Sequence, residues 1–273
     1  MSHATGTAGV DVGATLTKLA LPDRRGCRFE SIPSDRPERV REALADHATA
    51  RIGLTGGGAA RLATQLAETV TVDEFRAWHA GVAELLPAAR RDARFLLVSL
   101  GTGTSVMLVE DETVRRLGGT PLGGGTVLGL GRALTGTARF EDLCALAARG
   151  DRARVDLSVA EVYASGDAPL ATDVMASSFA RLADGPHRRS DGRPEDLARS
   201  LMAMVGENIA LLVGAFSLLV DVECVVFGGS TLRGNTVLTE ALSDYLGRFG
   251  RTPTYLPDGA FVGAVGARRL AAA

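Results

Sequence analysis

The chain has 273 residues, of which 46% are hydrophobic and 23% charged, and its formal net charge at pH 7 is −2. This composition is typical of a globular protein long enough for one large domain or two lobes. The near-neutral balance, with arginines scattered among carboxylates, argues against a nucleic-acid partner.

The first third of the chain predicts strands separated by tight turns. In chain order we expect strands at 9–12, 15–21 and 27–33, a helix near 36–48, a strand at 51–56, a helix within 56–66 and a strand at 69–72. Residues 73–86 then place apolar side chains at helical spacing, Trp78 among them, so this helix buries one face and Trp78 belongs to the core.

The middle third repeats the opening pattern. A buried apolar strand at 94–100 runs into a Gly-Thr-Gly-Thr turn, two further strands follow, and a glycine-rich loop leads into a helix within 121–136. Two units of strand, glycine–threonine turn and strand indicate two lobes built on one plan. We expect the division to fall between 1–92 and 93–273.

The last third predicts a polar connector at 183–194, a long helix at 195–220 and a strand at 222–227. The second half of the long helix is apolar on all sides, which favours burial at a lobe or subunit interface. A closing helix of small residues at 259–270 suits close packing. Strands alternating with helices make this an α/β fold with mixed sheets.

Cysteine content and hydropathy indicate the cellular compartment in which the protein works. The three cysteines show no metal-ligand spacing, which is typical of a reducing compartment. The longest apolar run, 209–220, is too short to span a bilayer, and the opening residues lack the pattern of a secretion signal. We therefore expect a cytoplasmic protein with no membrane partner.

The first turn (13–15) has the composition of a phosphate-binding loop. Gly13 permits a sharp turn, and backbone amides with Thr15 and Thr17 can face an anion. Lys18 adds a point charge and is the only lysine among 30 basic residues. Asp11, at the end of a strand, could anchor a hydrated Mg²⁺. The alternative is a plain hairpin with a solvated lysine.

Two further glycine turns follow apolar strands, a second turn at 100–105 and a third turn at 227–230. Each could be an ordinary turn. Glycine loops at strand ends are nevertheless where α/β folds bind nucleotide phosphates. Neither a Walker A motif nor a GxGxxG motif is present. The remaining way to bind nucleotide phosphates is between two lobes that each supply a glycine turn.

These stretches together resemble a known family. The matching segments are DVGATLTK (11–18), EF (74–75), GTGTS (101–105), RLGGTPLGGGTVLGLGRALTG (116–136), ASSF (176–179), SLMAMVGENI (200–209), GGSTLRGN (228–235) and GAVGA (263–267). In this combination the chain is similar to the type II pantothenate kinases of the acetate and sugar kinase/Hsp70/actin superfamily. The resemblance covers nearly the whole chain.

The resemblance implies a two-lobed actin-like ATPase (ribonuclease H-like) fold, with mixed β-sheets flanked by helices and a central nucleotide cleft. It implies ATP-dependent phosphorylation of the primary hydroxyl of pantothenate, the first step toward coenzyme A, in a homodimer. For ATP and Mg²⁺ it implies Asp11, Gly13, Ala14, Thr15, Thr17, Lys18, Thr102, Gly103, Gly124, Gly125, Thr126, Val127, Leu128, Phe140 and Ser230, with Asp11 toward the metal and Lys18 toward the transferred group.

For catalysis the resemblance implies Glu74 as the base and Arg116 as a substrate-binding group, with Gly119 and Thr120 beside the acceptor. Phosphoryl transfer depends chiefly on positioning and charge neutralisation, so Lys18 and Arg116 should matter as much as the base. From the residues alone, Glu74 could simply interact with its own helix N-terminus, and Arg116 could be a solvated arginine on a strand.

Two departures from the family pattern leave alternatives open. Ala14 replaces a second glycine, which is tolerable if its φ is negative. Trp78 and His79 stand where smaller residues are usual, and His79 is either a surface residue or part of the substrate pocket. The chain could therefore phosphorylate a related alcohol such as pantetheine or a biosynthetic intermediate. It could also be a catalytically silent nucleotide-binding regulator.

Overall fold

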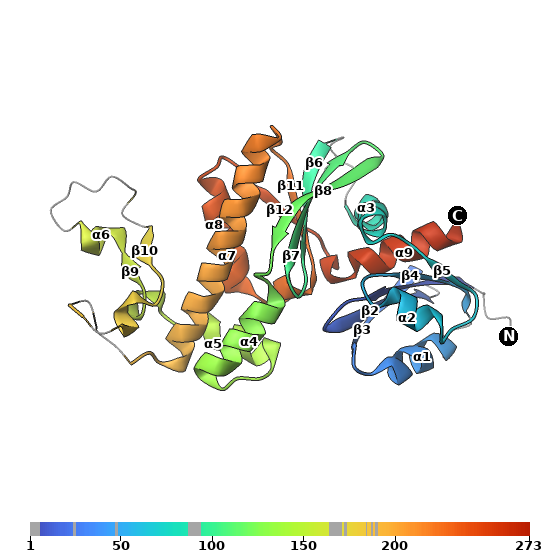
Figure 1. Cartoon of the computed structure of the whole chain (residues 1–273), viewed down its shortest axis with the longest axis horizontal. Coiled ribbons are helices and arrows are strands. Elements are labelled where there is room, and N and C mark those ends of the chain that lie inside the picture. The colour runs from blue at the N-terminus through green and yellow to red at the C-terminus, as the bar shows by residue number, and fades with distance from the viewer. Residues whose placement is uncertain are drawn as a thin grey trace.

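The computed structural model describes residues 6–23, 26–46, 49–86, 94–163, 171, 174–183, 185–186, 188 and 191–273. Two five-stranded mixed sheets lie at the centres of two lobes, with helices around and between them (Figure 1). The expected lobe boundary between 92 and 93 falls outside the described residues and stays a prediction.

The first sheet has the strand order β3-β2-β1-β4-β5. Its strands are β1 (Gly6–Val12), β2 (Leu16–Asp23), β3 (Gly26–Pro33), β4 (Thr49–Thr55) and β5 (Thr69–Thr71). β1 pairs antiparallel with β2 and parallel with β4. Helices α1 (Pro37–Ala45) and α2 (Ala59–Ala63) close one face over an aliphatic core that includes Val10, Leu19 and Leu54.

The second sheet has the order β12-β11-β6-β7-β8. Its strands are β6 (Arg94–Leu100), β7 (Thr104–Glu110), β8 (Thr113–Thr120), β11 (Val225–Gly228) and β12 (Pro253–Tyr255). One face is covered by α4 (Gly124–Thr135), α5 (Phe140–Ala148), α7 (Pro194–Leu219) and α8 (Thr236–Gly247). The other face packs against α3 (Glu74–Leu85), where Trp78 is a core residue as predicted.

Helices α3 and α9 (Val262–Ala272) form the layer between the two sheets (Figure 1). Although α9 ends the chain, it lies against β1 and β4 of the first sheet. Glycines allow this close approach: a Cβ on Gly9 would lie 1.9 Å from the Ala264 carbonyl oxygen, and one on Gly81 would lie 2.0 Å from that of Val262. The predicted close packing of the closing helix is confirmed.

The predicted elements agree with the structure to within a few residues, and the long helix predicted at 195–220 is α7. The helix predicted within 56–66 is shorter in the structure, where α2 has 5 residues. The sequence analysis did not predict α5 or β12. It also missed the small region of β9 (Leu157–Ser158), α6 (Val159–Val162) and β10 (Met175–Ser177), which projects beyond α7 (Figure 1). Only part of the predicted connector at 183–194 is described.

Within the described ranges, α7 is the single helix that is long and apolar enough to cross a membrane by length and composition. Of its most apolar window, 56% is buried inside the protein, as in the core helix of a globular fold.

Candidate functional site

The first turn places the only lysine beside a buried carboxylate. Asp11 and Lys18 are paired across β1 and β2, and Lys18 Nζ lies 3.6 Å from Asp11 Oδ2. Their side chains are only 6% and 11% exposed, respectively. A Cβ on Gly13 would lie 2.9 Å from Lys18 Nζ, so the missing side chain at Gly13 makes room for the ammonium group at the turn. This is not the solvated lysine of a plain hairpin.

Two glycines from distant parts of the chain surround the Asp11 carboxylate. A Cβ on Gly56 would lie 2.7 Å from Asp11 Oδ1, and a Cβ on Gly263 of α9 would lie 2.8 Å from Oδ2. Burial raises the pKa of Asp11, and the charge of Lys18 opposes that rise. Sequence reasoning missed both glycines. The GAVGA segment signalled close packing but not the residue it packs against.

These surroundings fit a magnesium ion held by one carboxylate. No group of three or more His, Cys, Asp or Glu side chains gathers as a ligand set in the described parts of the chain. Mg²⁺ needs no such set where it keeps several waters and binds one carboxylate together with substrate phosphates. Asp11 is a desolvated carboxylate at a strand end with no side chain on Gly56 or Gly263 to block its oxygens, so it is compatible with this mode of binding.

The side chain of Thr17 points to the opposite side of the first sheet. It is 2% exposed, its Oγ1 lies 3.0 Å from Ser34 Oγ, and Val40 and Leu62 are near. The predicted contact of the Thr17 hydroxyl with nucleotide is therefore not supported by its orientation. Ala14 is exposed and is not among the described residues with positive φ. A negative φ is the condition under which alanine can replace glycine here without strain.

The first and second turns meet. Thr15 Oγ1 lies 3.1 Å from Thr102 Oγ1, so two hydroxyl groups predicted to bind phosphate come together from different lobes. Gly103 follows in the same turn, and a Cβ on Gly123 would lie 2.7 Å from the Gly103 Cα. Gly123 is thus a residue of this site that sequence reasoning did not single out.

The N-terminus of α4 is tied to the second turn. The amide of Gly124 donates to the Gly101 carbonyl at 2.9 Å, and that of Gly125 donates to the Thr102 carbonyl at 2.9 Å. These two amides therefore hold the second turn, and the binding of ATP by Gly124 and Gly125 stays a prediction.

The other residues of α4 predicted to bind ATP differ in how far their side chains are buried. Thr126 Oγ1 donates to the Pro121 carbonyl at 2.9 Å, Val127 is fully buried in the core, and Leu128 is half-buried. The side chains of Thr126 and Val127 are thus already used by the fold.

The third turn lies against the second. Thr231 Oγ1 donates to the Gly101 carbonyl at 2.8 Å, which brings Ser230 next to the second turn. Gly229 has a φ of 122°, and a Cβ there would lie 2.0 Å from the Leu100 carbonyl oxygen. Phe140 begins α5 and is half-buried against the core of the second lobe.

Glu74 is the first residue of α3 and lies within electrostatic reach of the first turn. Asp73 already caps the helix, since its side chain accepts a hydrogen bond from the Arg76 amide at 3.0 Å. Burial raises the pKa of Glu74, the charges of Asp11 and Asp73 raise it further, and Lys18 lowers it. Glu74 is thus close enough to the Asp11–Lys18 pair for both charges to act on its carboxyl group.

Arg116 lies on β8 against the second turn. Its Nε makes a long 3.4 Å hydrogen bond to Ser105 Oγ, and a Cβ on Gly119 would lie 2.7 Å from its Nη2. The guanidinium group therefore lies over Gly119, while Arg116 as a whole remains exposed. The Thr120 hydroxyl accepts from the Leu122 amide at 3.2 Å, which directs it toward the loop before α4.

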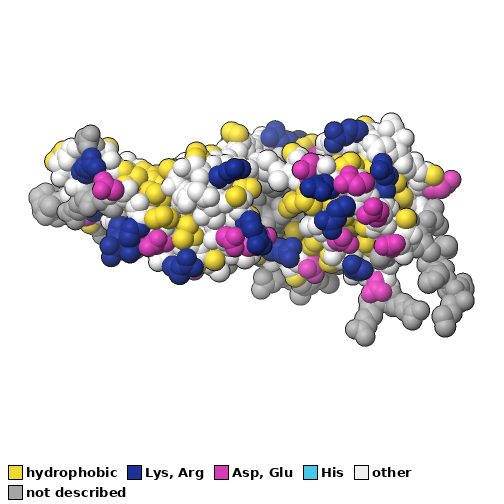
Figure 2. Space-filling model, turned by 90° about the horizontal axis from the view of Figure 1, so that it is seen from below, with side chains coloured by type: hydrophobic (Ala, Val, Ile, Leu, Met, Phe, Trp, Pro, Cys, Tyr) yellow, Lys and Arg dark blue, Asp and Glu magenta, His cyan; other side chains and the backbone are white. Residues whose placement is uncertain are grey.

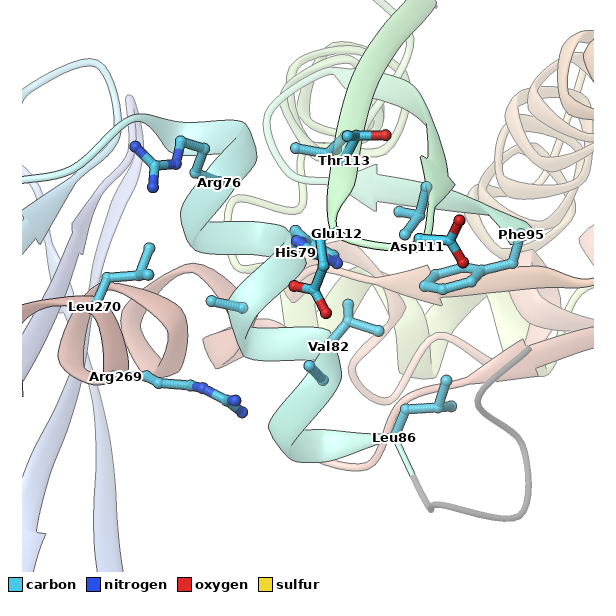
Figure 3. A pocket seen from close by; sticks show the side chains of 14 residues that line it. Arg76, His79, Val82, Leu86, Phe95, Asp111, Glu112, Thr113, Arg269 and Leu270 are labelled. Carbon is cyan, nitrogen blue, oxygen red and sulfur yellow. The ribbon is translucent and has the colours of Figure 1, made fainter. Parts of the chain in front are cut away.

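A large cavity lies elsewhere. It measures about 710 Å³ and runs along α3, between the tip of the β7–β8 hairpin and the end of α9 (Figure 3). His79 lines it, together with Arg76, Glu112 and Arg269. None of the residues predicted for ATP or acceptor binding does, so His79 belongs to a separate hollow.

Comparison with known proteins adds relatives over the whole length. A model of the family described as Fumble matches residues 78–269. The chain is 32% identical over 267 residues to a protein of Bacillus cereus (strain G9842) named type II pantothenate kinase, covering 96% of this chain and 97% of that one. A protein of the same name from Staphylococcus aureus (strain USA300) is 30% identical over 264 residues, covering 96% and 98%.

Solved structures support the fold. The activator of 2-hydroxyisocaproyl-CoA dehydratase from Clostridium difficile, with bound ADPNP, matches with a TM-score of 0.66 at 17% identity, covering 97% of this chain and 93% of that chain. A ROK family glucokinase from Streptomyces griseus, in complex with glucose and AMPPNP, matches with a TM-score of 0.59 at 15% identity, covering 97% and 99%. The expected actin-like ATPase fold is confirmed.

Proposed function

Because the chain belongs to the type II pantothenate kinase family, we propose that it transfers the γ-phosphoryl group of ATP to the primary hydroxyl of pantothenate. The product is 4'-phosphopantothenate, and the reaction is the first step of coenzyme A biosynthesis. The observation that carries the proposal is the buried Asp11–Lys18 pair at the first turn, whose charges act on Glu74.

The nucleotide phosphates would lie where the first and second turns meet. Thr15 and Thr102 supply hydroxyl groups there, and Lys18 supplies a positive charge that the buried surroundings do not screen. Ser230 in the third turn would contact the nucleoside, and Phe140 would lie beside it. Asp11 would hold Mg²⁺, which supplies charge neutralisation for the transferred group.

The acceptor hydroxyl would lie between Glu74 and the second lobe. A carboxylate within hydrogen-bond reach orients the hydroxyl and accepts its proton as the phosphoryl group is transferred. Burial and the neighbouring carboxylates raise the pKa of Glu74 toward the range in which a base is effective. Arg116 over Gly119 would bind the pantothenate carboxylate, and Thr120 would border the acceptor.

A homodimer is part of the proposal. Five leucines of α4 and α7 remain strongly exposed: Leu130, Leu134, Leu211, Leu218 and Leu219, the last of them 78% exposed. Hydrophobic side chains are more continuous over the half of the surface that carries α4 and α5 than over the first lobe, where charges of both signs are mixed (Figure 2). Covering these leucines by a second copy would remove them from water. We also propose a cytoplasmic location, where ATP is supplied.

The test is a coupled assay of ADP release with pantothenate as the varied substrate, using the wild type and Glu74→Gln. We expect saturable turnover in the wild type and a loss in kcat of about 10³-fold in the variant, within the range for removal of a general base. Turnover of pantetheine without turnover of pantothenate would instead support a kinase of a related alcohol. Absence of turnover of any of these alcohols by a wild type that binds ATP would support a nucleotide-binding regulator, and a kcat unchanged in Glu74→Gln would show that Glu74 is not the base.

A further inference from the structure

We propose that Ser34 and Thr231 are positioning residues that aim one backbone amide in each phosphate turn at the nucleotide. The inference rests on the proposed ATP site and adds to it two residues that lie outside the predicted set. Each hydroxyl binds the carbonyl of the glycine that begins a turn, Gly13 in the first lobe and Gly101 in the second.

Ser34 holds the first turn from the face opposite to Asp11. Its Oγ donates to the Gly13 carbonyl at 2.8 Å, and its amide donates to the Thr15 carbonyl at 3.0 Å. Because the single Ser34 hydroxyl proton is used on Gly13, Thr17 must be the donor in the 3.0 Å hydrogen bond between the two hydroxyl groups. Thr17 thus orients Ser34, and Ser34 fixes two carbonyls of the turn.

Thr231 acts on the second turn in the same way. It is 3% exposed, and its Oγ1 donates to the Gly101 carbonyl at 2.8 Å. That carbonyl also accepts from the Gly124 amide at 2.9 Å, so its direction is fixed by two donors. The two lobes therefore apply one device to equivalent glycines, with the hydroxyl supplied by residues far apart in the sequence.

The consequence follows from the planarity of the peptide unit. In a trans peptide the carbonyl of one residue and the N–H of the next point in opposite directions. Holding the Gly13 carbonyl toward Ser34 therefore turns the Ala14 N–H away from Ser34. Holding the Gly101 carbonyl toward Thr231 turns the Thr102 N–H away from Thr231. Preorganised amides of this kind bind anionic oxygens without a reorganisation cost.

The decisive variant is Ser34→Ala, with Ser34→Thr as the conservative partner. The small cavity of about 20 Å³ beside Ser34, Thr17 and Pro37 leaves space for the added methyl group of threonine. We expect Ser34→Ala to raise the KM for ATP threefold to tenfold, the range for one hydrogen bond, and to leave the KM for pantothenate within twofold. Ser34→Thr should restore the wild-type KM for ATP, and Thr231→Val and Thr231→Ser should behave as a second such pair.

A binding measurement separates positioning of the turn from a general structural effect. Calorimetric titration with a non-hydrolysable ATP analogue and with adenosine should show weaker binding of the analogue by Ser34→Ala, with adenosine unchanged. Thr113→Val is a matched control, because Thr113 Oγ1 donates to the Glu110 carbonyl at 2.8 Å at the far end of β7, and it should bind both as the wild type does.

The outcomes are distinguishable from failure of the proposed function. Equal loss of analogue and adenosine binding in Ser34→Ala, or a change below twofold in both, overturns the positioning role. A wild type that binds the analogue but does not phosphorylate pantothenate overturns the proposed acceptor, while the titrations still decide on Ser34. A wild type that binds no analogue overturns both.

Discussion

The two phosphate turns share their backbone plan and differ in charge. Each joins two antiparallel strands, begins at a glycine and has a carbonyl held by a hydroxyl from elsewhere in the chain. The first has a buried ion pair, Asp11 with Lys18, beside it, whereas the second presents glycines and hydroxyl groups. One lobe therefore supplies the charge, and the other supplies neutral hydrogen-bonding groups and shape.

The largest expected effect is in the charged turn. Lys18→Arg keeps the charge but places a planar five-donor group where the ammonium group fits beside Gly13, so we expect a fall in kcat of about 10³-fold. Thr102→Val in the neutral turn should cost no more than about tenfold. Steady-state kinetics of both variants measure the contrast. Comparable losses in the two variants would show that charge and neutral contacts contribute equally.

A smaller effect should separate the two leading glycines. A Cβ on Gly13 would meet the Leu16 carbonyl oxygen at 2.8 Å and Lys18 Nζ at 2.9 Å, whereas one on Gly101 would meet nothing within 4 Å. We expect Gly13→Ala to raise the KM for ATP about tenfold, since relieving such close contacts moves the backbone at a cost of about 1–3 kcal/mol. Gly101→Ala should stay within twofold. Thermal unfolding of both variants controls for loss of the fold, and a more damaging Gly101→Ala would contradict the difference.

The smallest effect concerns pH. The pKa of Glu74 is raised from its ordinary value of 4.5 by burial and by Asp11 and Asp73, so the activity of a Glu74 base should fall on the acid side at a pH above 4.5. Asp73→Asn keeps a side chain that can cap α3 and removes one negative charge. We therefore expect the acid limb of kcat/KM for pantothenate to move to lower pH. Movement to higher pH would show that Glu74 does not set this limb.

Local features of the fold were predictable from the sequence. Apolar runs ending at glycine and threonine gave β1, β2, β6 and β7, and helical spacing gave α3 and α7. These signals lie within a few residues of one another, so periodicity and turn chemistry are sufficient. Family motifs then indicated Lys18 and Glu74, and in the structure the charge of Lys18 acts on Glu74.

Contacts between distant segments were not predictable from local patterns. The place of Gly263 against Asp11 depends on α9 crossing back to the first sheet, which no local pattern reports. The direction of the Thr17 hydroxyl depends on the pairing of β2 with β3 and on Ser34 beyond it, because a side chain's face is set by strand register. The hydrogen bonds from the Gly124 and Gly125 amides to carbonyls of the second turn likewise depend on how the turn packs against α4, which the local sequence does not report.

The return of α9 to the first sheet has a consequence for biosynthesis. The strands of the first lobe leave the ribosome well before α9, the helix that closes one of its faces. Through most of translation that face, including Gly9 and Gly53, has no α9 to cover it. Nascent chains with uncovered sheet surface are prone to misassociate, so this lobe is the part that we expect chaperones to shield until α9 has emerged.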